Sequence, residues 1–452
     1  MKLLYLTNGY PPRHTAGTES YTAALAQAWA QAGHTVRVVC AGDWEAGARP
    51  YNGRARAGQA GVQVDRLNLN WTAGRDPNSA LFDNPATAAV VAETLAEFQP
   101  DLVHLTSAYT LSASVLRPVT RRGVPLVVTL TDFWFICPQV TLRRSDGRLC
   151  DGRTTADECL RCMLGSSHFY QRARRLLPEA ALTPLLRWAS RHPGAARRRG
   201  LRGYALDMAR RKATLLPLLE QAAAVVAPSH TLADLYSANG LRQAVRVIPY
   251  GHDIGWAAQA QPRPADGRVV FGYAGRLTEA KGVHVLVEAA ARLDAQLPIE
   301  VQLYGDPAAE PDYVARLKAV AGSDPRVRFM GHFAREALAQ VYSQIDALVV
   351  PSVWYENNPL VIQEAYAAGR PVIASELGGM AEFVQPGVSG LLFAAGEAAA
   401  LAETLTDVAR DPALLARLRA GVPPVRTMAQ ELDEIGAVYA EALATRRVAA
   451  HA

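Results

Sequence analysis

The chain of 452 residues is long enough for two or three globular domains, and half of its residues are apolar. No apolar run approaches the length that spans a bilayer, and residues 8–12 break the first apolar stretch too early for a signal peptide, so we expect a cytoplasmic protein. The net charge of +5 is mild for this size, and we expect no nucleic-acid partner.

Short apolar, β-branched runs alternate with helical patterns along the first half of the chain. This alternation predicts an α/β domain over 1–245, with a parallel sheet and helices on both of its faces. Ligands of such sheets bind at the carboxyl ends of the strands, so a site is expected where strands lead into loops. The predicted strands are Leu3–Thr7, Val36–Cys40, Leu102–Leu105, Leu126–Leu130 and Val225–Ala227.

Three junctions of this domain carry candidate residues. Gly17 follows the first strand, and a glycine there lets backbone amides approach a phosphate or a sugar closely, whereas His14 is interpreted as a loop histidine. His104 ends a neighbouring strand and is either a ligand-binding residue or a satisfied core histidine. Thr131 and Asp132 end the fourth strand, and a threonine hydroxyl donates one hydrogen bond but takes up no proton at neutral pH.

Four cysteines form a C-x12-C-x8-C-x2-C pattern in an irregular stretch rich in Arg, Asp and Gly: Cys137, Cys150, Cys159 and Cys162. In a cytosolic protein this cluster is consistent with one tetrahedral structural zinc that holds a loop with little core of its own. Four free thiols are the alternative, since the spacing lacks the compact pairs of a zinc ribbon. Cys40 ends a strand and is predicted to be buried. Catalysis is expected to need no cofactor.

The segment 166–220 carries twelve Arg and Lys residues against three acids, so the rest of the chain is net negative. Basic side chains next to Leu and Trp188 suit a helix that lies on an anionic membrane surface, and a solvated helical face is the alternative. The twelve cationic residues are Arg172, Arg174, Arg175, Arg187, Arg191, Arg197, Arg198, Arg199, Arg202, Arg210, Arg211 and Lys212.

Residues 259–267 are rich in Pro, Gly and polar side chains and indicate a linker. Beyond them the strand pattern restarts, which predicts a second α/β domain over 268–425. Its predicted strands are Arg268–Ala274, Val301–Tyr304, Val327–Met330, Ala347–Val350 and Val372–Ala374.

Two cations lie on the glycine-bracketed loop that follows the first strand of this second domain. Arg276 and Lys281 are five residues apart, directly before an amphipathic helix predicted at Val283–Leu293. Such a pair can bind a diphosphate, Arg in a bidentate manner and Lys as a point charge.

Two carboxylates, Glu356 and Glu364, lie eight positions apart in the sequence, with a helix start between them. Asn358 is predicted as the N-cap and Pro359 as the first helical residue, because Asn accepts hydrogen bonds from free amides and Pro lacks the hydrogen that would be orphaned. The free amides suit a phosphate and the carboxylates suit hydroxyls, so a nucleotide sugar is a natural ligand.

These segments resemble family 4 of the retaining, nucleotide-sugar-dependent glycosyltransferases, a group with the GT-B fold. The segment from Glu356 to Glu364 is similar to the E-x7-E motif, and the loop with Arg276 and Lys281 to the G-R-x4-K-G pattern. Residues 378–382 are similar to the G-G-x-x-E loop, although Glu382 is expected to be a helix-start acid.

The resemblance covers most of the chain. It implies an α/β GT-B fold, with two Rossmann-like domains whose parallel sheets face a central cleft, the N-terminal domain for the acceptor and the C-terminal domain for the nucleotide sugar. The segment 426–452 would then contain a helix, predicted at Ala429–Ala444, that crosses back to the N-terminal domain. One position departs from the family, because Thr131 occupies the place of a histidine that contacts the donor sugar.

The family also implies roles for the candidates. Arg276, Lys281 and the helix amides near Pro359 would stabilise the leaving diphosphate, Glu356 would bind donor-sugar hydroxyls, and Glu364 the ribose. The predicted catalytic residues are Glu356, Arg276, Lys281 and Asp132, and the predicted substrate-binding residues are Gly17, His104, Thr131, Asn358, Leu360 and Glu364.

The sequence therefore predicts a retaining glycosyltransferase that moves a hexose-like sugar from a UDP- or GDP-sugar to an acceptor hydroxyl, in cell-surface polysaccharide or glycolipid synthesis. The expected acceptor is a glycan or a lipid-linked glycan, and an anionic membrane surface is a further expected partner. Two alternatives remain open, a GT-B nucleotide-sugar epimerase and a non-catalytic protein that binds sugar nucleotides.

Overall fold

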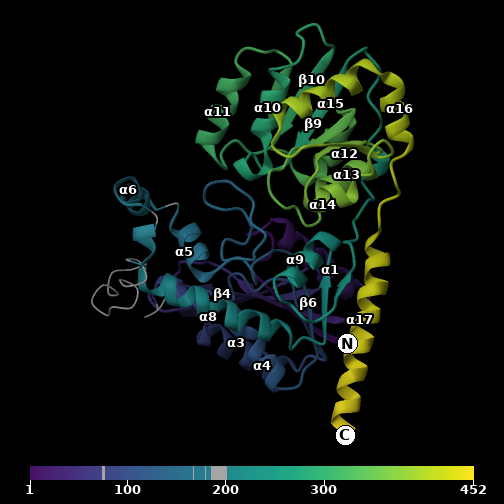
Figure 1. Cartoon of the computed structure of the whole chain (residues 1–452). Helices are drawn as coiled ribbons and strands as arrows, with labels where there is room; N and C mark the ends of the chain where they lie inside the picture. Colours follow the sequence, from purple (N-terminus) through teal and green to yellow (C-terminus); the bar gives the residue numbers. More distant parts are fainter. Residues whose placement is uncertain (74–76, 166, 179, 185–200, 452) are drawn as a thin grey trace. The chain divides into compact units, whose positions relative to one another are not determined.

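The structure is a computed structural model that describes residues 1–73, 77–165, 167–178, 180–184 and 201–451. It divides into two compact units, the first formed by Met1–Pro249 with Ala429–Ala452 and the second by Tyr250–Met428. Each unit is built on one largely parallel sheet with helices packed against it (Figure 1). The predicted class of two Rossmann-like α/β units is therefore confirmed.

The strands of the first unit form a sheet in the order β3-β4-β2-β1-β5-β6-β7-β8, parallel except for the antiparallel pair β3 and β4. The central strands are buried on both faces, as expected of apolar β-branched runs. The strands are β1 (Lys2–Thr7), β2 (Thr35–Ala41), β3 (Tyr51–Gln59), β4 (Val62–Leu69), β5 (Leu102–Leu105), β6 (Leu126–Thr129), β7 (Ala224–Ala227) and β8 (Val245–Val247).

Helices of the first unit connect these strands, and most of them lie against the sheet. They are α1 (Gly17–Gln31), α2 (Pro77–Ala80), α3 (Pro85–Phe98), α4 (Leu116–Arg121), α5 (Ala156–Leu164), α6 (His168–Leu176), α8 (Leu201–Leu219), α9 (His230–Ala238) and the C-terminal α17 (Met428–His451).

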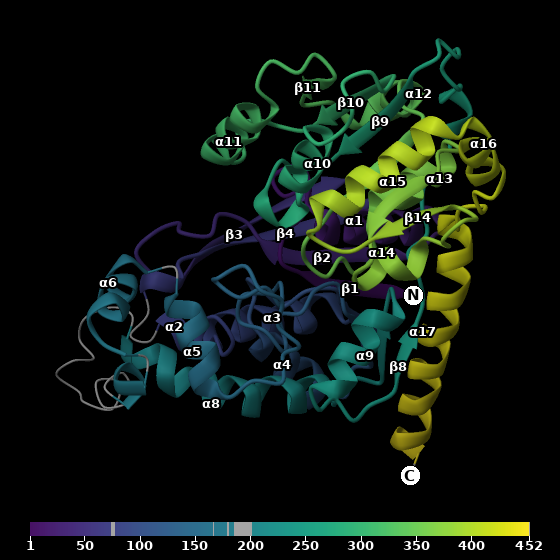
Figure 2. The same cartoon turned by 45° about the horizontal axis from the view of Figure 1, so that its top comes forward.

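Helix α17 packs on the first unit, although it follows the second unit in the chain. Its Tyr439 hydroxyl lies 2.7 Å from the Tyr5 hydroxyl of β1, and its Glu431 accepts a hydrogen bond of 2.8 Å from Tyr21 of α1. Glu441 pairs with Arg246 of β8, which runs beside α17 in Figure 2. The buried contacts of Tyr439 and Glu431 and the exposed ion pair of Glu441 attach the end of the chain to the first unit.

The second unit has a fully parallel sheet in the order β11-β10-β9-β12-β13-β14. Its strands are β9 (Val269–Ala274), β10 (Ile299–Tyr304), β11 (Val327–Gly331), β12 (Ala347–Val350), β13 (Val372–Ser375) and β14 (Gly390–Phe393). Its helices are α10 (Val283–Ala290), α11 (Pro311–Ala321), α12 (Leu338–Ser343), α13 (Leu360–Ala367), α14 (Gly378–Phe383), α15 (Ala398–Arg410) and α16 (Pro412–Ala420).

Alternate residues of the second sheet enter two different cores. Phe271 and Val349 pack with α10, α11 and α15, whereas Val270 and Leu348 pack with α12, α13 and α14. The two sets of helices lie on opposite faces of the sheet, because successive strand side chains point to opposite sides. The carboxyl edge of β9, β12 and β13 is left to loops, and the candidate residues of the second unit lie there.

None of the helices in the described residues has the length and apolar character needed to cross a membrane.

Candidate functional site

Glu356 is the centre of a polar cluster at the carboxyl edge of the second sheet. Its Oε1 atom accepts hydrogen bonds from Lys281 Nζ at 2.7 Å, from Ser352 Oγ at 2.8 Å and from Trp354 Nε1 at 2.8 Å. The Lys281 ammonium also lies 5.5 Å from the centre of the Trp354 ring. Lys281 and Glu356, which were predicted to bind different groups of the ligand, thus form an ion pair. The other carboxylate oxygen of Glu356, Oε2, has no hydrogen bond within the described residues.

The loop that carries Arg276 and Lys281 packs closely against the end of β12. Gly282 has a φ of +67°, and a Cβ there would lie 1.8 Å from the Pro351 carbonyl oxygen, so only glycine allows this approach. Tyr273 donates a hydrogen bond of 2.6 Å to the carbonyl of Arg276. The Arg276 side chain is exposed, and the sharp turn at Gly282 places Lys281 beside Glu356.

The start of α13 corrects one prediction. Pro359, with ψ of 102°, is the N-cap, and Leu360 is the first helical residue, so Asn358 does not cap the helix. Asn358 is instead buried to 91%, and neither its Oδ1 nor its Nδ2 has a hydrogen-bond partner within the described residues. A buried amide without partners is costly, and a bound polar ligand would satisfy it.

The loop after β13 closes over the backbone next to Glu356. The Gly379 amide donates a hydrogen bond of 2.7 Å to the Glu356 carbonyl, and a Cβ on Gly379 would lie 2.5 Å from the Asn357 carbonyl oxygen. Glycine is required at this contact. The expectation for Glu382 is wrong, because it lies in the last turn of α14 rather than at its start.

Glu364 lies on the second turn of α13, as predicted, and lines a small pocket of about 30 Å³ that also contacts Trp256, Arg335 and Leu360. Tyr342 donates a hydrogen bond of 3.2 Å to Oε2, and Arg335 lies 3.8 Å from Oε1. Burial raises the pKa of Glu364, while Arg335 and the Tyr342 hydroxyl oppose that rise.

Thr131 and Asp132 follow β6 in the first unit. The Thr131 hydroxyl donates to the Thr106 carbonyl at 2.8 Å and accepts a hydrogen bond of 3.0 Å from Thr18 of α1. Asp132 accepts hydrogen bonds from the Trp134 amide at 2.8 Å and from Ser107 at 3.3 Å. Both residues are therefore fixed at the carboxyl edge of the first sheet, where a ligand of an α/β sheet binds.

Asp132 supports a prediction on pH dependence. Burial raises its pKa to about 6 against hydrogen bonds from Trp134 and Ser107, so the folded chain holds this proton more tightly than the unfolded chain. The stability that the proton confers is complete below the usual aspartate pKa and is lost as the pH rises through about 6. In calorimetric scans, Asp132→Asn should therefore gain stability over wild type between about pH 4 and pH 6, on the order of 2 kcal/mol.

The control for this prediction is Asp433→Asn, which removes an exposed carboxylate from α17 of the same unit. A difference in melting temperature between Asp132→Asn and wild type that stays constant from pH 4 to pH 8 would contradict the assignment.

His104 of β5 is a core histidine. It is fully buried, its Nδ1 lies 2.6 Å from the Tyr439 hydroxyl, and its Nε2 lies 2.8 Å from the Thr129 hydroxyl. Burial lowers its pKa to about 3. Because both ring nitrogens are engaged inside the core, the alternative of a satisfied core histidine holds and the ligand-binding alternative does not.

The loop before α1 holds a further candidate. Gly17 is the first residue of the helix and is exposed, and a Cβ there would meet nothing within 4 Å, so no contact within the described residues requires glycine. His14 lies in this loop, as predicted, and stacks on Trp44 with ring centres 4.9 Å apart.

Sequence reasoning missed several polar partners. Glu19 of α1 is buried, and its Oε1 accepts a hydrogen bond of 2.8 Å from Asn8, while its Oε2 has no partner among the described residues. Ser352 and Trp354 were missed as ligands of Glu356. The nearness of Ser352 and Trp354 to Glu356 in sequence was the available signal for these two contacts.

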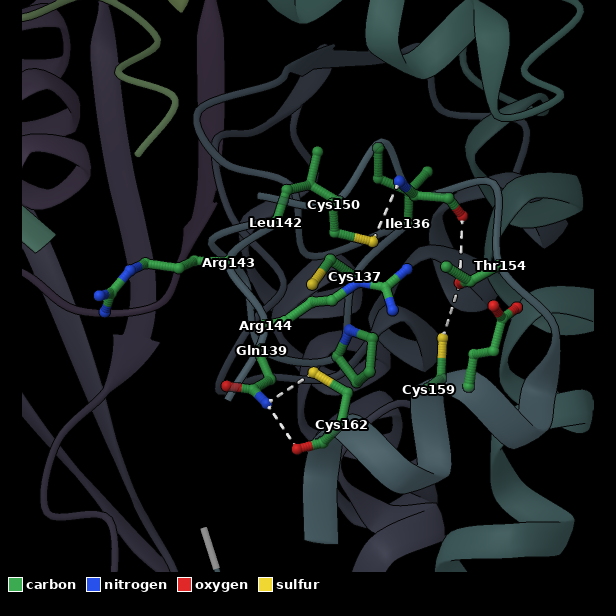
Figure 3. Close-up of a pocket in the computed structure, with 13 residues that line it drawn as sticks. Ile136, Cys137, Gln139, Leu142, Arg143, Arg144, Cys150, Thr154, Cys159 and Cys162 are labelled. Carbon is green, nitrogen blue, oxygen red and sulfur yellow. Dashed lines mark hydrogen bonds between the residues drawn. The ribbon is translucent and has the colours of Figure 1, made fainter. Parts of the chain in front are cut away.

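The four clustered cysteines line one pocket of about 20 Å³ between the loop after β6 and α5, together with Gln139 and Arg144 (Figure 3). All four are free and partly buried, and Cys40 is fully buried in β2, as predicted. In the described part of the chain, no three Cys, His, Asp or Glu side chains are gathered as ligands around a common point.

The basic segment is only partly described. Arg187, Arg191, Arg197, Arg198, Arg199 and Trp188 lie outside the described residues, as does the side chain of Arg202. Arg172, Arg174 and Arg175 are exposed on α6.

The three cations of α8 contact protein groups. Arg210 pairs with Asp83 at 3.1 Å, Arg211 is buried and donates to the Trp134 carbonyl, and Lys212 donates to the Thr154 carbonyl. The prediction of a membrane-facing surface is therefore wrong for the buried Arg211, whereas the side chain of Arg210 is 53% exposed.

Two family models together match most of the chain. Residues 16–251 match the glycosyl transferase 4-like domain, and residues 268–411 match the glycosyl transferases group 1. The two matches correspond closely to the two sheets and include the loops that carry the candidate residues.

Curated relatives match over part of their length. The chain is 34% identical over 189 residues to a D-inositol 3-phosphate glycosyltransferase of Mycolicibacterium smegmatis, covering 41% of this chain and 42% of the relative. It is 36% identical over 207 residues to a protein of the same description from Frankia alni, covering 42% and 50%. The match thus spans half or less of these relatives.

Solved structures match over nearly the whole chain. Sucrose-phosphate synthase from Thermosynechococcus elongatus has a TM-score of 0.65 at 20% identity, covering 98% of this chain and all of that one. HepE from Anabaena, solved in complex with UDP and glucose, has a TM-score of 0.60 at 21% identity, covering 98% and 99%. At sequence identities this low, the structural similarity shows that the fold is shared.

Proposed function

Since the chain belongs to the glycosyl transferase 4-like family, whose model covers more than half of it, we propose that it transfers a sugar from a nucleotide-diphosphate sugar to an acceptor hydroxyl with retention of configuration. The donor binds to the second unit, at the carboxyl edge of β9, β12 and β13. The acceptor binds to the first unit, at the edge that carries Thr131 and Asp132.

The observation that carries this proposal is the cluster around Glu356. Lys281, Ser352 and Trp354 all donate to Oε1, which fixes the carboxylate and leaves Oε2 for a ligand hydroxyl. The ammonium of Lys281 remains a quarter exposed and can also interact with an anion. A cation and an oriented carboxylate side by side suit a ligand that joins a phosphate to a hydroxyl-bearing ring.

Three groups then stabilise the charge that grows on the leaving diphosphate. They are Lys281, the exposed guanidinium of Arg276, and the free amides at Leu360 where α13 begins. Asn358 adds an unpaired amide at the same place. Such preorganised charge is commonly the largest contribution to catalysis. The departing phosphate accepts the proton of the acceptor hydroxyl, so the reaction proceeds without a histidine at Thr131.

The nucleotide and the acceptor are proposed from the relatives. HepE is solved with UDP, which makes UDP-sugars the first donors to test, with GDP-sugars next. The curated relatives are described as acting on D-inositol 3-phosphate, so this compound belongs in the acceptor panel beside glycans and lipid-linked glycans from cell-surface polysaccharide or glycolipid synthesis.

A donor screen tests this function. Thermal-shift measurements with UDP, GDP and their sugars should identify one nucleotide that raises Tm, because a ligand that binds only the folded chain stabilises it. Incubation of that donor with the acceptor panel should then release nucleoside diphosphate. Conversion of the donor into an isomeric nucleotide sugar without an acceptor would indicate an epimerase instead, and binding without turnover would indicate a non-catalytic protein.

We also propose that the chain associates peripherally with an anionic membrane through α6. Arg172, Arg174 and Arg175 are exposed there beside Leu176, whose side chain is 84% exposed. Each cation near an anionic surface adds about 1 kcal/mol of attraction, which salt weakens. The chain should therefore co-sediment with phosphatidylserine vesicles at low salt, and replacing the three arginines with serine should reduce the bound fraction several-fold.

Replacement of Arg121 and Arg122, two exposed cations that end α4 in the same unit, is the matched control and should leave vesicle binding largely unchanged. Equal sedimentation with neutral phosphatidylcholine vesicles, or none with either lipid, would identify α6 as a solvated face.

A further inference from the structure

The cysteine pocket is built from three separate segments of the first unit. Cys137 comes from the loop after β6, and Cys150 follows the short antiparallel bridge between Arg143 and Leu149. Cys159 and Cys162 lie one turn apart on α5, so their side chains share a face of that helix. Figure 3 shows the four cysteine side chains around the pocket, with the side chain of Arg144 crossing the view between their sulfur atoms.

Each sulfur lies next to a hydrogen-bond donor. The Gly152 amide donates to Cys150 Sγ at 3.4 Å, Gln139 Nε2 donates to Cys162 Sγ at 3.2 Å, and the Thr154 hydroxyl lies 3.0 Å from Cys159 Sγ. Backbone hydrogen bonds from Leu142 and Gln139 reach the Cys137 sulfur. Donors of this kind orient metal-bound thiolates and stabilise their negative charge.

Arg211 of α8 is a buried cation beside this pocket. It is 4% exposed and lies over the Trp134 ring at 5.2 Å, and no carboxylate lies within ion-pair distance of it among the described residues. Its guanidinium donates a hydrogen bond to the Trp134 carbonyl, and Asp132, Cys137 and Cys159 are near enough to interact with its charge. A buried guanidinium without an ion pair is costly, and negative charge on the two sulfurs would offset the cost.

The segment between β6 and α5 has little regular structure beyond the bridge at Arg143, although Phe133, Ile136 and Leu142 in it are buried. The hydrophobic cluster at α5 is small, and its fully buried members are Leu160, Tyr170 and Met208. A structural metal would cross-link these segments.

From these observations we propose that Cys137, Cys150, Cys159 and Cys162 bind one structural Zn²⁺ as four thiolates. The four side chains are not gathered around a common point in this structure, so binding requires the sulfurs to move together until they reach Zn–S distances of about 2.3 Å in a tetrahedral arrangement. Four protons leave on binding, and the resulting centre carries about two net negative charges, which the buried Arg211 and the adjacent Arg144 and Lys212 complement. The site is structural because all four positions are taken by protein sulfurs.

The test is the zinc content of tag-free wild-type protein, expressed with added zinc and dialysed without chelator. Elemental analysis should give about one zinc per chain, and X-ray absorption at the zinc edge should give four sulfur neighbours at about 2.3 Å. Replacing both Cys159 and Cys162 with serine should reduce the zinc content at least tenfold. The matched control is Cys40→Ala, which removes a buried cysteine of β2 and should keep the full zinc content.

Measurements on the wild type decide the proposal even where the double variant does not fold. Less than a tenth of a zinc per chain, zinc bound mainly through nitrogen or oxygen, disulfides between the four cysteines, or four thiols that react freely in the folded protein would each overturn it. None of these outcomes depends on the identity of the donor or on activity.

Discussion

Lys281→Ala is expected to lower kcat/KM for the nucleotide-sugar donor by about a hundredfold or more, since one preorganised charge stabiliser contributes that much when it acts on the transition state. The Lys281 ammonium pairs with Glu356 at 2.7 Å and is the cation closest to that carboxylate. The effect should fall mainly on kcat, because the charge on the leaving diphosphate grows during the reaction.

The matched control is Lys318→Ala. Lys318 also carries an ammonium over an aromatic ring, 5.7 Å from the centre of Phe329, but it lies in the last turn of α11, away from the carboxyl edge of the sheet. Its replacement should leave kcat/KM within about twofold of wild type. Circular dichroism should show native folding for both variants, because Ser352 and Trp354 still bind Glu356. Turnover at the wild-type rate in Lys281→Ala would rule out the diphosphate assignment.

Glu364→Ala is expected to raise the donor KM by about tenfold to a hundredfold, the loss expected when a hydrogen bond to a charged group is removed. Glu364 lines a pocket beside α13 with Trp256 and Arg335, and we assign it to the ribose hydroxyls. Because the ribose does not react, the carboxylate binds substrate and transition state alike, so kcat should change less than KM.

Two further variants separate binding from folding. Glu364→Gln keeps one acceptor oxygen and should recover part of the affinity, whereas Glu403→Ala, which removes an exposed acid of α15, should leave KM unchanged. The fold should survive the loss of Glu364, since Tyr342 also bonds the Val361 carbonyl and Arg335 is two-thirds exposed. An unchanged KM in Glu364→Ala, measured by initial rates over a range of donor concentrations, would contradict the ribose assignment.

Much of the fold follows from hydrophobic periodicity. The apolar strands β1, β2, β5, β9 and β12 were predicted within one residue of their ends, because strands buried on both faces are continuous apolar runs. Of the edge strands, β11 was predicted as Val327–Met330, whereas β3, β8 and β14 were missed, as was β4 beside β3. Strand β3 is mostly exposed, so its polar residues show no buried face, and β14 is only partly buried and begins with a glycine. The helix predicted at Ala429–Ala444 is longer, from Met428 to His451.

The candidate site was predictable in its residue types but not in its internal contacts. The ion pair of Lys281 and Glu356 joins positions 75 residues apart, and only the fold brings them together. The cap at Asn358 was wrong because Pro359 adopts an extended ψ, which moves the helix start to Leu360. Arg211 was counted as a surface cation because the sequence does not reveal that α8 turns it inward.

The measurement that tests the central claim most directly is the fate of a UDP-sugar incubated with the chain and the acceptor panel, followed by NMR of the product. We predict release of UDP and a new glycosidic bond whose anomeric configuration equals that of the donor, with the rate of both lowered by about a hundredfold or more in Lys281→Ala. An inverted product, an isomerised UDP-sugar formed without acceptor, or no turnover with any UDP- or GDP-sugar that raises Tm would contradict the account.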